Sequence, residues 1–411
     1  MRENRINFYL GVVAIIGFLA GVYGSLLLLI ASLMTILIIS LARLWNKYAF
    51  AKLSIKRSLS QQKVGFGQKM YYTIELENRK ILPLLSLKFE DKISEGTKFV
   101  NQKVLTKVFA RSMNKFEDIF SLKWYQRTNR SYEFAPQRRG LYQFGCFKLY
   151  YSGIFGLFSN TLNESKPKEL IVFPRIVPLS KFGLNESQLF GSKMRKGWIF
   201  EDPLNQVGVR PYHRSDNIKQ INWKASARHN QLESNIYNPS FDKELHLFLN
   251  APVQGAWWNQ TEKNKLELGI ICAASIIEHS SKYGYQIGLY TNISSKNHKN
   301  GSYISVKPGK DTGQRERLLT NLALLQAFSI GKISRIMEME EKKIKNGSTV
   351  IIISSSLDPE LKKILKYYNR FFQLILICIG NDLRKERLIG IDQYWIAGGE
   401  SWDEIKSLEL S

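Results

Sequence analysis

The chain has 411 residues, 44% of them hydrophobic and 23% charged, which excludes a disordered or fibrous protein and predicts two or three folded domains. A formal net charge of +24, from 59 Lys and Arg against 35 Asp and Glu, favours an anionic partner. Nucleic acid is disfavoured because the sequence has no zinc finger and no RNA-binding signature of basic and aromatic residues. Lipid headgroups fit the charge better, because an apolar segment opens the chain.

That apolar segment predicts a membrane hairpin within residues 1–50. Residues 6–42 carry no charge, and one helix of this length would be about 55 Å long, against a hydrocarbon core of ~30 Å. Two glycines in Gly21-Val22-Tyr23-Gly24 predict a break, and hence helices at about residues 7–22 and 25–44. Two other interpretations compete with a membrane hairpin: a cleaved signal peptide and a buried hairpin in a soluble protein. A signal peptide is disfavoured because the second apolar run follows the first without a polar segment between them.

Basic residues flank the hairpin on both sides. Arg2 and Arg5 precede the first span, and Arg43, Lys47 and Lys52 follow the second. The positive-inside rule therefore places both ends in the cytoplasm. We expect a multi-pass protein of the cell membrane whose soluble part is cytoplasmic.

Residues 53–175 predict a β-rich domain, either a sandwich or a barrel. Short alternating runs, such as residues 70–76 and 116–122, are separated by charged or glycine-containing turns. A further strand pair is predicted at residues 139–151, closing on Phe155-Gly156-Leu157-Phe158. After Pro174 this rhythm stops, and residues 179–205 are typical of a linker.

Residues 244–411 predict an α/β domain with a largely parallel sheet. Strands are expected at residues 245–249, 286–290, 349–353 and 372–379, and helices at residues 261–282, 314–325, 335–346 and 358–368. This alternation is typical of βαβ units. The uninterrupted apolar run in residues 350–353 indicates a central strand buried on both faces.

Between linker and α/β domain, within residues 176–243, polar and aromatic residues are dense in segment 209–228. Asp216 could cap a short helix or pair with Arg210 or Arg228, and Lys224 and Arg228 would share one helix face. Trp223 would then turn inward. One interpretation is a structural clasp in which Trp223 packs; the other is a docking surface, because Arg and Trp are enriched at interface hot spots.

This segment resembles the signature of the bacterial family called domain of unknown function 58. The residues that match the family pattern position by position are Arg210, Tyr212, Asp216, Ile221, Trp223, Lys224, Ala227 and Arg228. Ser215 departs from it, because the family usually has glycine there. A second landmark is seen in Arg139-Gly140 and residues 155–158.

The resemblance implies a membrane hairpin, a β-rich region and a C-terminal α/β domain similar to von Willebrand factor A, which is Rossmann-like. It also implies a scaffold or adaptor that acts with a MoxR-type ATPase, because such proteins are often encoded together. These implications go beyond what the residues of this chain establish by themselves.

Metal binding is not expected. Von Willebrand-like domains can hold Mg²⁺ through Asp-x-Ser-x-Ser after the first strand, but here that strand runs into Asn250-Ala251-Pro252-Val253-Gln254. Asp358, after the strand at residues 349–353, is expected to cap the next helix. The five histidines have no metal-ligand spacing, and the isolated Cys146, Cys272 and Cys378 indicate neither a disulfide framework nor a metal knuckle.

Signatures of enzymes are absent as well. The sequence has no phosphate loop, zinc-protease motif, nucleophile elbow or Cys-x-x-Cys pair. Pro308-Gly309-Lys310-Asp311-Thr312 lacks the first glycine of a phosphate loop and is expected to be a strand-to-helix turn. The leading hypothesis is a non-enzymatic, membrane-tethered adaptor without cofactors; the alternatives are an enzyme with a site around Asp216, Lys224 and Arg228, and a structural envelope factor.

Overall fold

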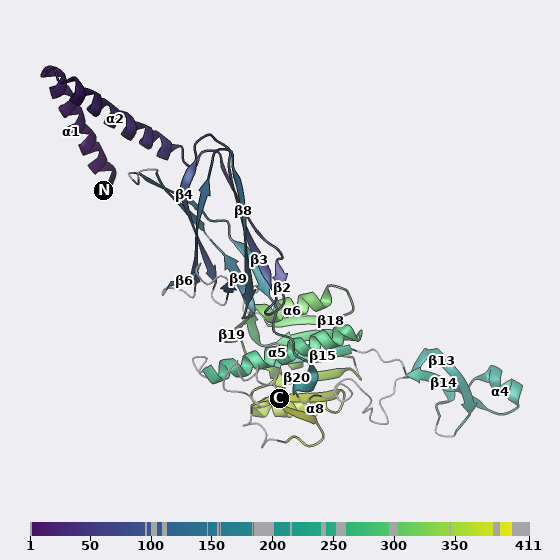
Figure 1. The fold of residues 1–411 in the computed structure, drawn as a ribbon. Coiled ribbons are helices and arrows are strands. Elements are labelled where there is room, and N and C mark those ends of the chain that lie inside the picture. The colour runs from purple at the N-terminus through teal and green to yellow at the C-terminus, as the bar shows by residue number, and fades with distance from the viewer. Residues whose placement is uncertain are drawn as a thin grey trace. The chain divides into compact units, whose positions relative to one another are not determined.

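The computed structural model covers residues 1–411 and describes residues 2–94, 97–99, 105–108, 113–145, 147–153, 156, 158–182, 184, 201–213, 216–239, 244–251, 260–295, 303–345, 347–380 and 387–396. The chain divides into two compact units, Met1–Phe173 and Pro174–Ser411 (Figure 1). Phe155, Leu157 and Cys146, which the sequence analysis singled out, lie outside the described residues.

The first unit begins with two antiparallel helices, α1 (Arg2–Val22) and α2 (Leu26–Lys47). The turn between them contains Gly24, whose φ of +67° suits glycine. The helices approach closely, because a Cβ on Gly17 would lie 2.5 Å from Ser32 Oγ. Among the described residues, α2 is long and apolar enough to cross a membrane, and the apolar part of α1, Ile6–Val22, is shorter.

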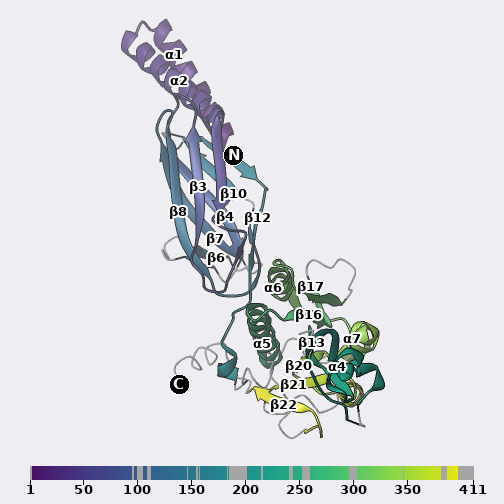
Figure 2. The ribbon, with the colours of Figure 1, turned by 90° about the vertical axis from the view of Figure 1, so that its right-hand side faces the viewer.

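The rest of the first unit consists of two sheets around one core (Figure 2). One sheet has the order β1 (Leu53–Leu59), β3 (Met70–Asn78), β8 (Arg127–Pro136), β5 (Thr97–Phe99). The other has the order β11 (Ser159–Glu164), β10 (Phe147–Ser152), β4 (Leu84–Ser94), β9 (Gly140–Phe144), β12 (Lys168–Val172), β2 (Lys63–Val64), with β7 (Met113–Leu122) on β4 and β6 (Leu105–Val108) on β7. Alternate residues face the core, as the burial of β3 and β10 shows.

A buried polar cluster links the two sheets inside this aromatic core. Arg57 of β1 donates from Nη1 to Asp91 Oδ2 of β4 at 3.1 Å, and Tyr72 Oη of β3 donates to the same oxygen at 2.6 Å. The Arg57 guanidinium also donates to the carbonyls of Gly145 and Lys166, and its carbon lies 4.4 Å from the centre of the Phe147 ring. Burial raises the pKa of Asp91, while its hydrogen bond from Tyr72 and the charge of Arg57 oppose this rise.

The second unit contains a six-stranded sheet that is parallel except for one edge strand. Its order is β18 (Ile304–Gly309), β16 (Gln286–Thr291), β15 (Glu244–Asn250), β20 (Thr349–Ser354), β21 (Gln373–Ile379), β22 (Asp392–Ile396), and β18 is antiparallel. A separate pair joins β17 (Ile293–Ser295) to β19 (Leu325–Ser329). The described α-helices of this unit are α4 (Trp223–His229), α5 (Gln260–Lys282), α6 (Gln314–Leu324), α7 (Ile333–Glu340) and α8 (Pro359–Tyr368). Its described 3-10 helices are η2 (Leu179–Phe182), η3 (Ile218–Gln220) and η4 (Glu341–Lys343).

Helices cover both faces of this sheet, as its apolar strands require. At Gly269, α5 lies against Leu249 and Ile353, where a Cβ would come within 3.3 and 3.6 Å of their side chains. On the other face, α7 and α8 share a buried cluster with Phe248 and Ile352. The expected helix at residues 335–346 instead starts at Ile333 and ends as α7 at Glu340, followed by η4.

His246 lies buried in β15 and is expected to make the stability of this unit depend on pH. Its Nδ1 lies 3.2 Å from Tyr290 Oη, and burial lowers the pKa of the imidazole to about 4, although Glu244 and Glu340 oppose this shift and Lys345 adds to it. The unfolded chain takes up the proton near pH 6.5 and the folded unit only near 4. The free energy of unfolding should therefore fall as pH drops from 6.5 to 4, by on the order of 3 kcal/mol.

Hydrogen exchange of the β15 and β16 amides, corrected for intrinsic exchange at each pH, measures this loss. A His246→Gln variant provides the control, because glutamine can keep a hydrogen bond to Tyr290 but does not titrate. The pH slope should be shallower in this variant. An equal slope in both proteins would show that another group is responsible.

Candidate functional site

Segment 209–228 lies within a β-hairpin formed by β13 (Glu201–Pro211) and β14 (Glu233–Pro239). The strands pair antiparallel, with Arg210 opposite Ser234 and Glu201 opposite Pro239. Between them the chain forms η3 and α4. The strand β13 begins at Glu201, so the prediction of a linker up to residue 205 was wrong at its end: pairing with β14 extends the strand.

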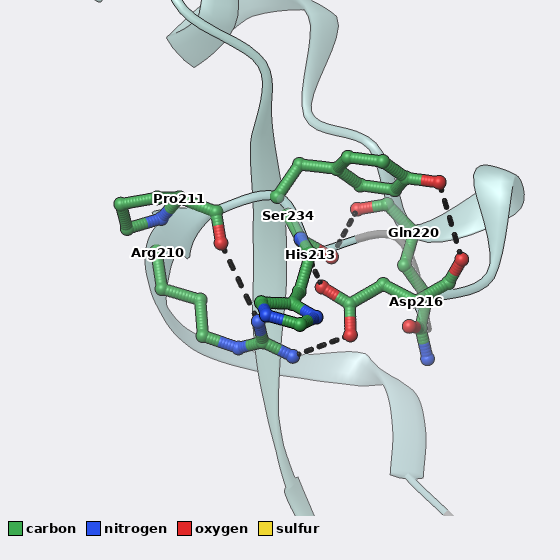
Figure 3. A network of polar contacts seen from close by, with 7 residues as sticks. Arg210, Pro211, His213, Asp216, Gln220 and Ser234 are labelled. Atoms are coloured by element: carbon green, nitrogen blue, oxygen red, sulfur yellow. Dashed lines mark hydrogen bonds and ion pairs between the residues drawn. The ribbon is translucent and has the colours of Figure 1, made fainter.

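Asp216 holds the turn after β13 in place (Figure 3). Its Oδ1 accepts a hydrogen bond from Arg210 Nη2 at 2.8 Å, and its Oδ2 accepts one from the His213 backbone N–H at 2.9 Å. Tyr212 Oη lies 3.4 Å from the Asp216 carbonyl, to which it donates. The Arg210 guanidinium and the His213 N–H lower the pKa of the Asp216 carboxyl, which stays ionised at neutral pH.

Asn222 and Ser226 hold α4 against β14 through hydrogen bonds. Asn222 Oδ1 accepts from the Ala225 N–H at 3.0 Å and so caps the helix, while its Nδ2 donates to Asn235 Oδ1 at 2.7 Å. The Ser226 hydroxyl accepts from the Glu233 N–H at 2.8 Å. Glu233, 5% exposed, in turn lies 2.7 Å from His229 Nδ1. Hydrogen bonds from side chains therefore hold this seven-residue helix in place against β14.

The opposite side of α4 is open. Trp223 is 67% exposed, and Lys224, Ala227 and Arg228 are exposed beside it. Neither Lys224 nor Arg228 makes a hydrogen bond or ion pair with any residue that the structure describes. The expectation that Trp223 turns inward was therefore wrong, because Asn222 and Ser226 occupy the side of the helix that faces the hairpin.

One further expectation for this segment, that Asp216 caps a short helix, differs from the structure. Asp216 pairs with Arg210, as one of the two pairings considered, but it caps no helix. The caps are Asn217, which accepts from the Lys219 N–H at the start of η3, and Asn222. Ser215, the departure from the family pattern, lies outside the described residues.

The remaining residues of the family pattern support the hairpin. The Tyr212 N–H donates to the Leu232 carbonyl at 2.8 Å, and Ile221 forms an isolated bridge with Ser234. Both Tyr212 and Ile221 are partly buried. Asn222, Ser226 and Glu233 were missed by the sequence analysis, and the Asn before a short helical stretch was the signal that could have indicated the first of them.

The carboxyl edge of the α/β sheet is the second place where ligands commonly bind. Here Asn250 Nδ2 donates to Ser354 Oγ at 2.9 Å, and Asn292 Nδ2 lies 3.1 Å from Asn250 Oδ1 and 2.7 Å from the Gly331 carbonyl. Uncharged amides and hydroxyls thus bond to one another at this edge. Asp358 caps α8, its Oδ1 accepting from the Leu361 N–H at 2.9 Å.

No group of three or more His, Cys, Asp or Glu residues that could hold a metal occurs within the described part of the chain. Residues 252–254 of the tested metal motif lie outside it. A cavity of about 550 Å³ opens beside this edge and is lined by residues of α7 and the turn before it, together with Asn292, Tyr303 and Glu360 of α8. None of its lining residues belongs to segment 209–228.

Comparisons with known proteins match this arrangement to one family. Residues 208–396, which begin in β13 and end with β22, match the model of a family described as "Protein of unknown function DUF58". An uncharacterized protein of Bacillus subtilis (strain 168), YeaD, is 23% identical over 315 residues, which cover 74% of this chain and 71% of that protein.

Two of the solved structures that match each cover 29% of this chain. A CARDB domain from Pyrococcus furiosus is 14% identical and covers 29% of this chain and 90% of its own, with a TM-score of 0.19. A type II cohesin domain from the cellulosome of Acetivibrio cellulolyticus is 8% identical and covers 29% of this chain and 95% of its own, with a TM-score of 0.22.

Proposed function

We propose, from the premise that this chain belongs to the DUF58 family of proteins of unknown function, that it is a membrane-tethered adaptor without catalytic activity. The observation that carries the proposal is the exposed face of α4. Trp223, Lys224 and Arg228 form this docking face, on a helix that polar contacts hold in place from the opposite side. An exposed Trp beside cations that bond to no described residue supports an interface hot spot, because Trp and Arg are enriched at such sites.

The alternative of an enzyme with a site around Asp216, Lys224 and Arg228 receives less support from these residues. Asp216 is committed to Arg210, and Lys224 and Arg228 extend from a different element without bonding to any described residue. A catalytic site would need convergent polar groups at a concave surface, such as a deep pocket beside Asp216. The cavity of about 550 Å³ is lined by other residues.

The tether in this proposal is a two-span hairpin formed by α1 and α2. Their apolar side chains are largely exposed, which suits lipid surroundings better than water. Arg43 and Lys47 in the last turns of α2, together with the basic residues that start α1, support a cytoplasmic location for the remainder of the chain.

The α/β part is proposed to be a von Willebrand factor A-like domain that has lost its metal site. Numbered along the chain, the six strands of its sheet lie in the order 3-2-1-4-5-6, which is a doubly wound arrangement. At its carboxyl edge, Asn250 and Ser354 bond to each other where such a domain would offer oxygen ligands to Mg²⁺. This supports a role in interaction rather than in ion-dependent binding.

The partner is proposed to be a MoxR-type ATPase, on the strength of the family resemblance. The docking face is cationic and aromatic, so the matching surface of the partner should be acidic with an apolar pocket for Trp223. A net charge of +24 would also speed the encounter with an acidic partner at low salt.

A pull-down with the detergent-solubilised full chain tests this proposal. Wild type should retain a purified MoxR-type ATPase, whereas Lys224→Ala and Arg228→Ala should retain much less of it, because each removes one exposed cation from the docking face. The matched control is Lys363→Ala, which removes an exposed lysine from α8 and should leave retention unchanged. Equal retention by all four proteins would rule out a docking role for this face.

A further inference from the structure

Hydrogen bonds join the C-terminal end of α2 to the turn between β3 and β4. Trp45 Nε1 in the last turns of α2 donates to the Pro83 carbonyl at 3.3 Å. Lys80 donates to the carbonyl of Ala49 and, at 2.7 Å, to that of Ala51. Burial lowers the pKa of the Lys80 ammonium to about 8. The turn at residues 79–83, between β3 and β4, is therefore held against the end of the helix.

A second turn lies against the first. The Tyr125 N–H donates to the Lys80 carbonyl at 3.2 Å, and Asn78 Nδ2 donates to the carbonyls of Leu82 and Lys123, both at 2.9 Å. The turn at residues 123–126, between β7 and β8, thus joins residues 79–83 and the end of α2. In Figure 1 the strands β4 and β8 reach the same end of the unit as α2.

Three large apolar or aromatic side chains are exposed at this end, with lysines beside them. Ile81 is 67% exposed, Trp124 68% and Tyr125 67%, although single exposed residues of this kind are common on proteins. Here they gather on two adjoining turns. Lys52 and Lys123 are exposed among them and make no ion pair with any residue that the structure describes.

The short distance between the apolar part of α2 and these turns determines how deep the turns lie relative to a membrane that α2 spans. The apolar run of α2 ends near Leu44, and at 1.5 Å per helical residue the end of the helix at Lys47 lies only about 5 Å further on. The headgroup layer of a bilayer is several ångströms deep on each side of the hydrocarbon. The turns bound to Trp45 and Ala49 must therefore lie at the level of the headgroups when α2 spans the membrane.

We propose that Ile81, Trp124 and Tyr125 insert into the headgroup interface of an anionic membrane and that Lys52 and Lys123 bind its lipid phosphates. This inference rests on the proposed membrane tether and adds a second, lipid-binding contact made by the β-sheets. Trp and Tyr favour the interface because their rings are apolar and their N–H and O–H groups remain hydrogen-bonded there. The contact fixes the orientation of the first unit on the bilayer.

Lipid quenching of single fluorophores tests this contact in the full chain. A bimane label is attached at Trp124→Cys in a Cys146→Ser background, since Cys272 and Cys378 are buried. The protein is reconstituted into nanodiscs of phosphatidylcholine and phosphatidylglycerol that contain a lipid with a nitroxide at its headgroup. The label at position 124 should be quenched several times more strongly than one at Gln137→Cys.

Gln137 is the matched control because it is exposed and follows the far end of β8, whose ten residues span roughly 33 Å. Quenching at position 124 should weaken in phosphatidylcholine alone, because the lysines then face zwitterionic headgroups, whose choline offsets the charge of the phosphate. Failure of the protein to float with liposomes would instead refute the membrane tether. Stable flotation with equal, weak quenching at both positions would overturn only the lipid contact, and would leave the two turns as a surface for another protein.

Discussion

Asp91→Ala is expected to destabilise the first unit by about 3 to 5 kcal/mol, the largest stability loss we expect from a single substitution in this chain. The side chain of Asp91 is fully buried and that of Arg57 is 4% exposed. Removing the carboxylate would leave the guanidinium of Arg57 charged in the core without a counter-ion among the described residues, although the Gly145 and Lys166 carbonyls and the Phe147 ring would still contact it. It would also orphan the Tyr72 hydroxyl.

Hydrogen exchange of the β3 and β4 amides in the solubilised full chain reports this loss separately from the second unit. Glu75→Ala serves as the matched control, since Glu75 pairs with Arg127 at 2.8 Å on the same β3 but at the surface. Its loss should cost no more than about 1 kcal/mol. Similar losses in the two variants would mean that water or a neighbouring group compensates for the buried charge.

Trp223→Ala is expected to abolish most binding of the partner while leaving the fold intact. Because two thirds of the side chain is exposed, its removal should change the free energy of unfolding by no more than about 0.5 kcal/mol. As a hot spot it should weaken binding by at least ~2 kcal/mol, which is about 30-fold in Kd. Titration of the purified ATPase against the solubilised chain, alongside hydrogen exchange of α4, measures both quantities.

Asn222→Ala separates the two roles of this segment. It removes the cap of α4 and the hydrogen bond to Asn235, so it should destabilise the hairpin by about 1 kcal/mol and raise exchange in α4. Trp223→Ala should not. If Trp223→Ala instead cost more than about 2 kcal/mol of stability with unchanged affinity, segment 209–228 would be a structural clasp.

The sheet of the second unit was largely predictable because its strands are apolar runs between helices. β20 was predicted at residues 349–353 and is observed at Thr349–Ser354. A strand that is covered on both faces is an uninterrupted apolar run, so its ends are easy to recognise in the sequence. The edge strand β18 was missed. It contains Pro308 and alternates exposed and partly covered residues, so its sequence looks like a turn.

The residues of the proposed docking face were singled out from sequence, but the side of α4 on which they lie was not. A helix of seven residues shows no repeat from which its buried side could be read. That side is set by Asn222, Ser226 and Asn235, whose contacts join residues up to thirteen positions apart. Likewise, nothing local indicates that the turns at residues 79–83 and 123–126 adjoin the end of α2, because Lys80 and Tyr125 meet only through sheet pairing.

The pairing of Glu201 with Pro239 places the first and last residues of the β13–β14 hairpin side by side. Paired strands lie about 5 Å apart, so a two-residue turn could close the gap if everything between were removed. The β13–β14 hairpin is therefore a segment that could be exchanged as a whole. A relative could acquire a different partner by exchanging about forty residues, without any change to its anchor or to the sheet.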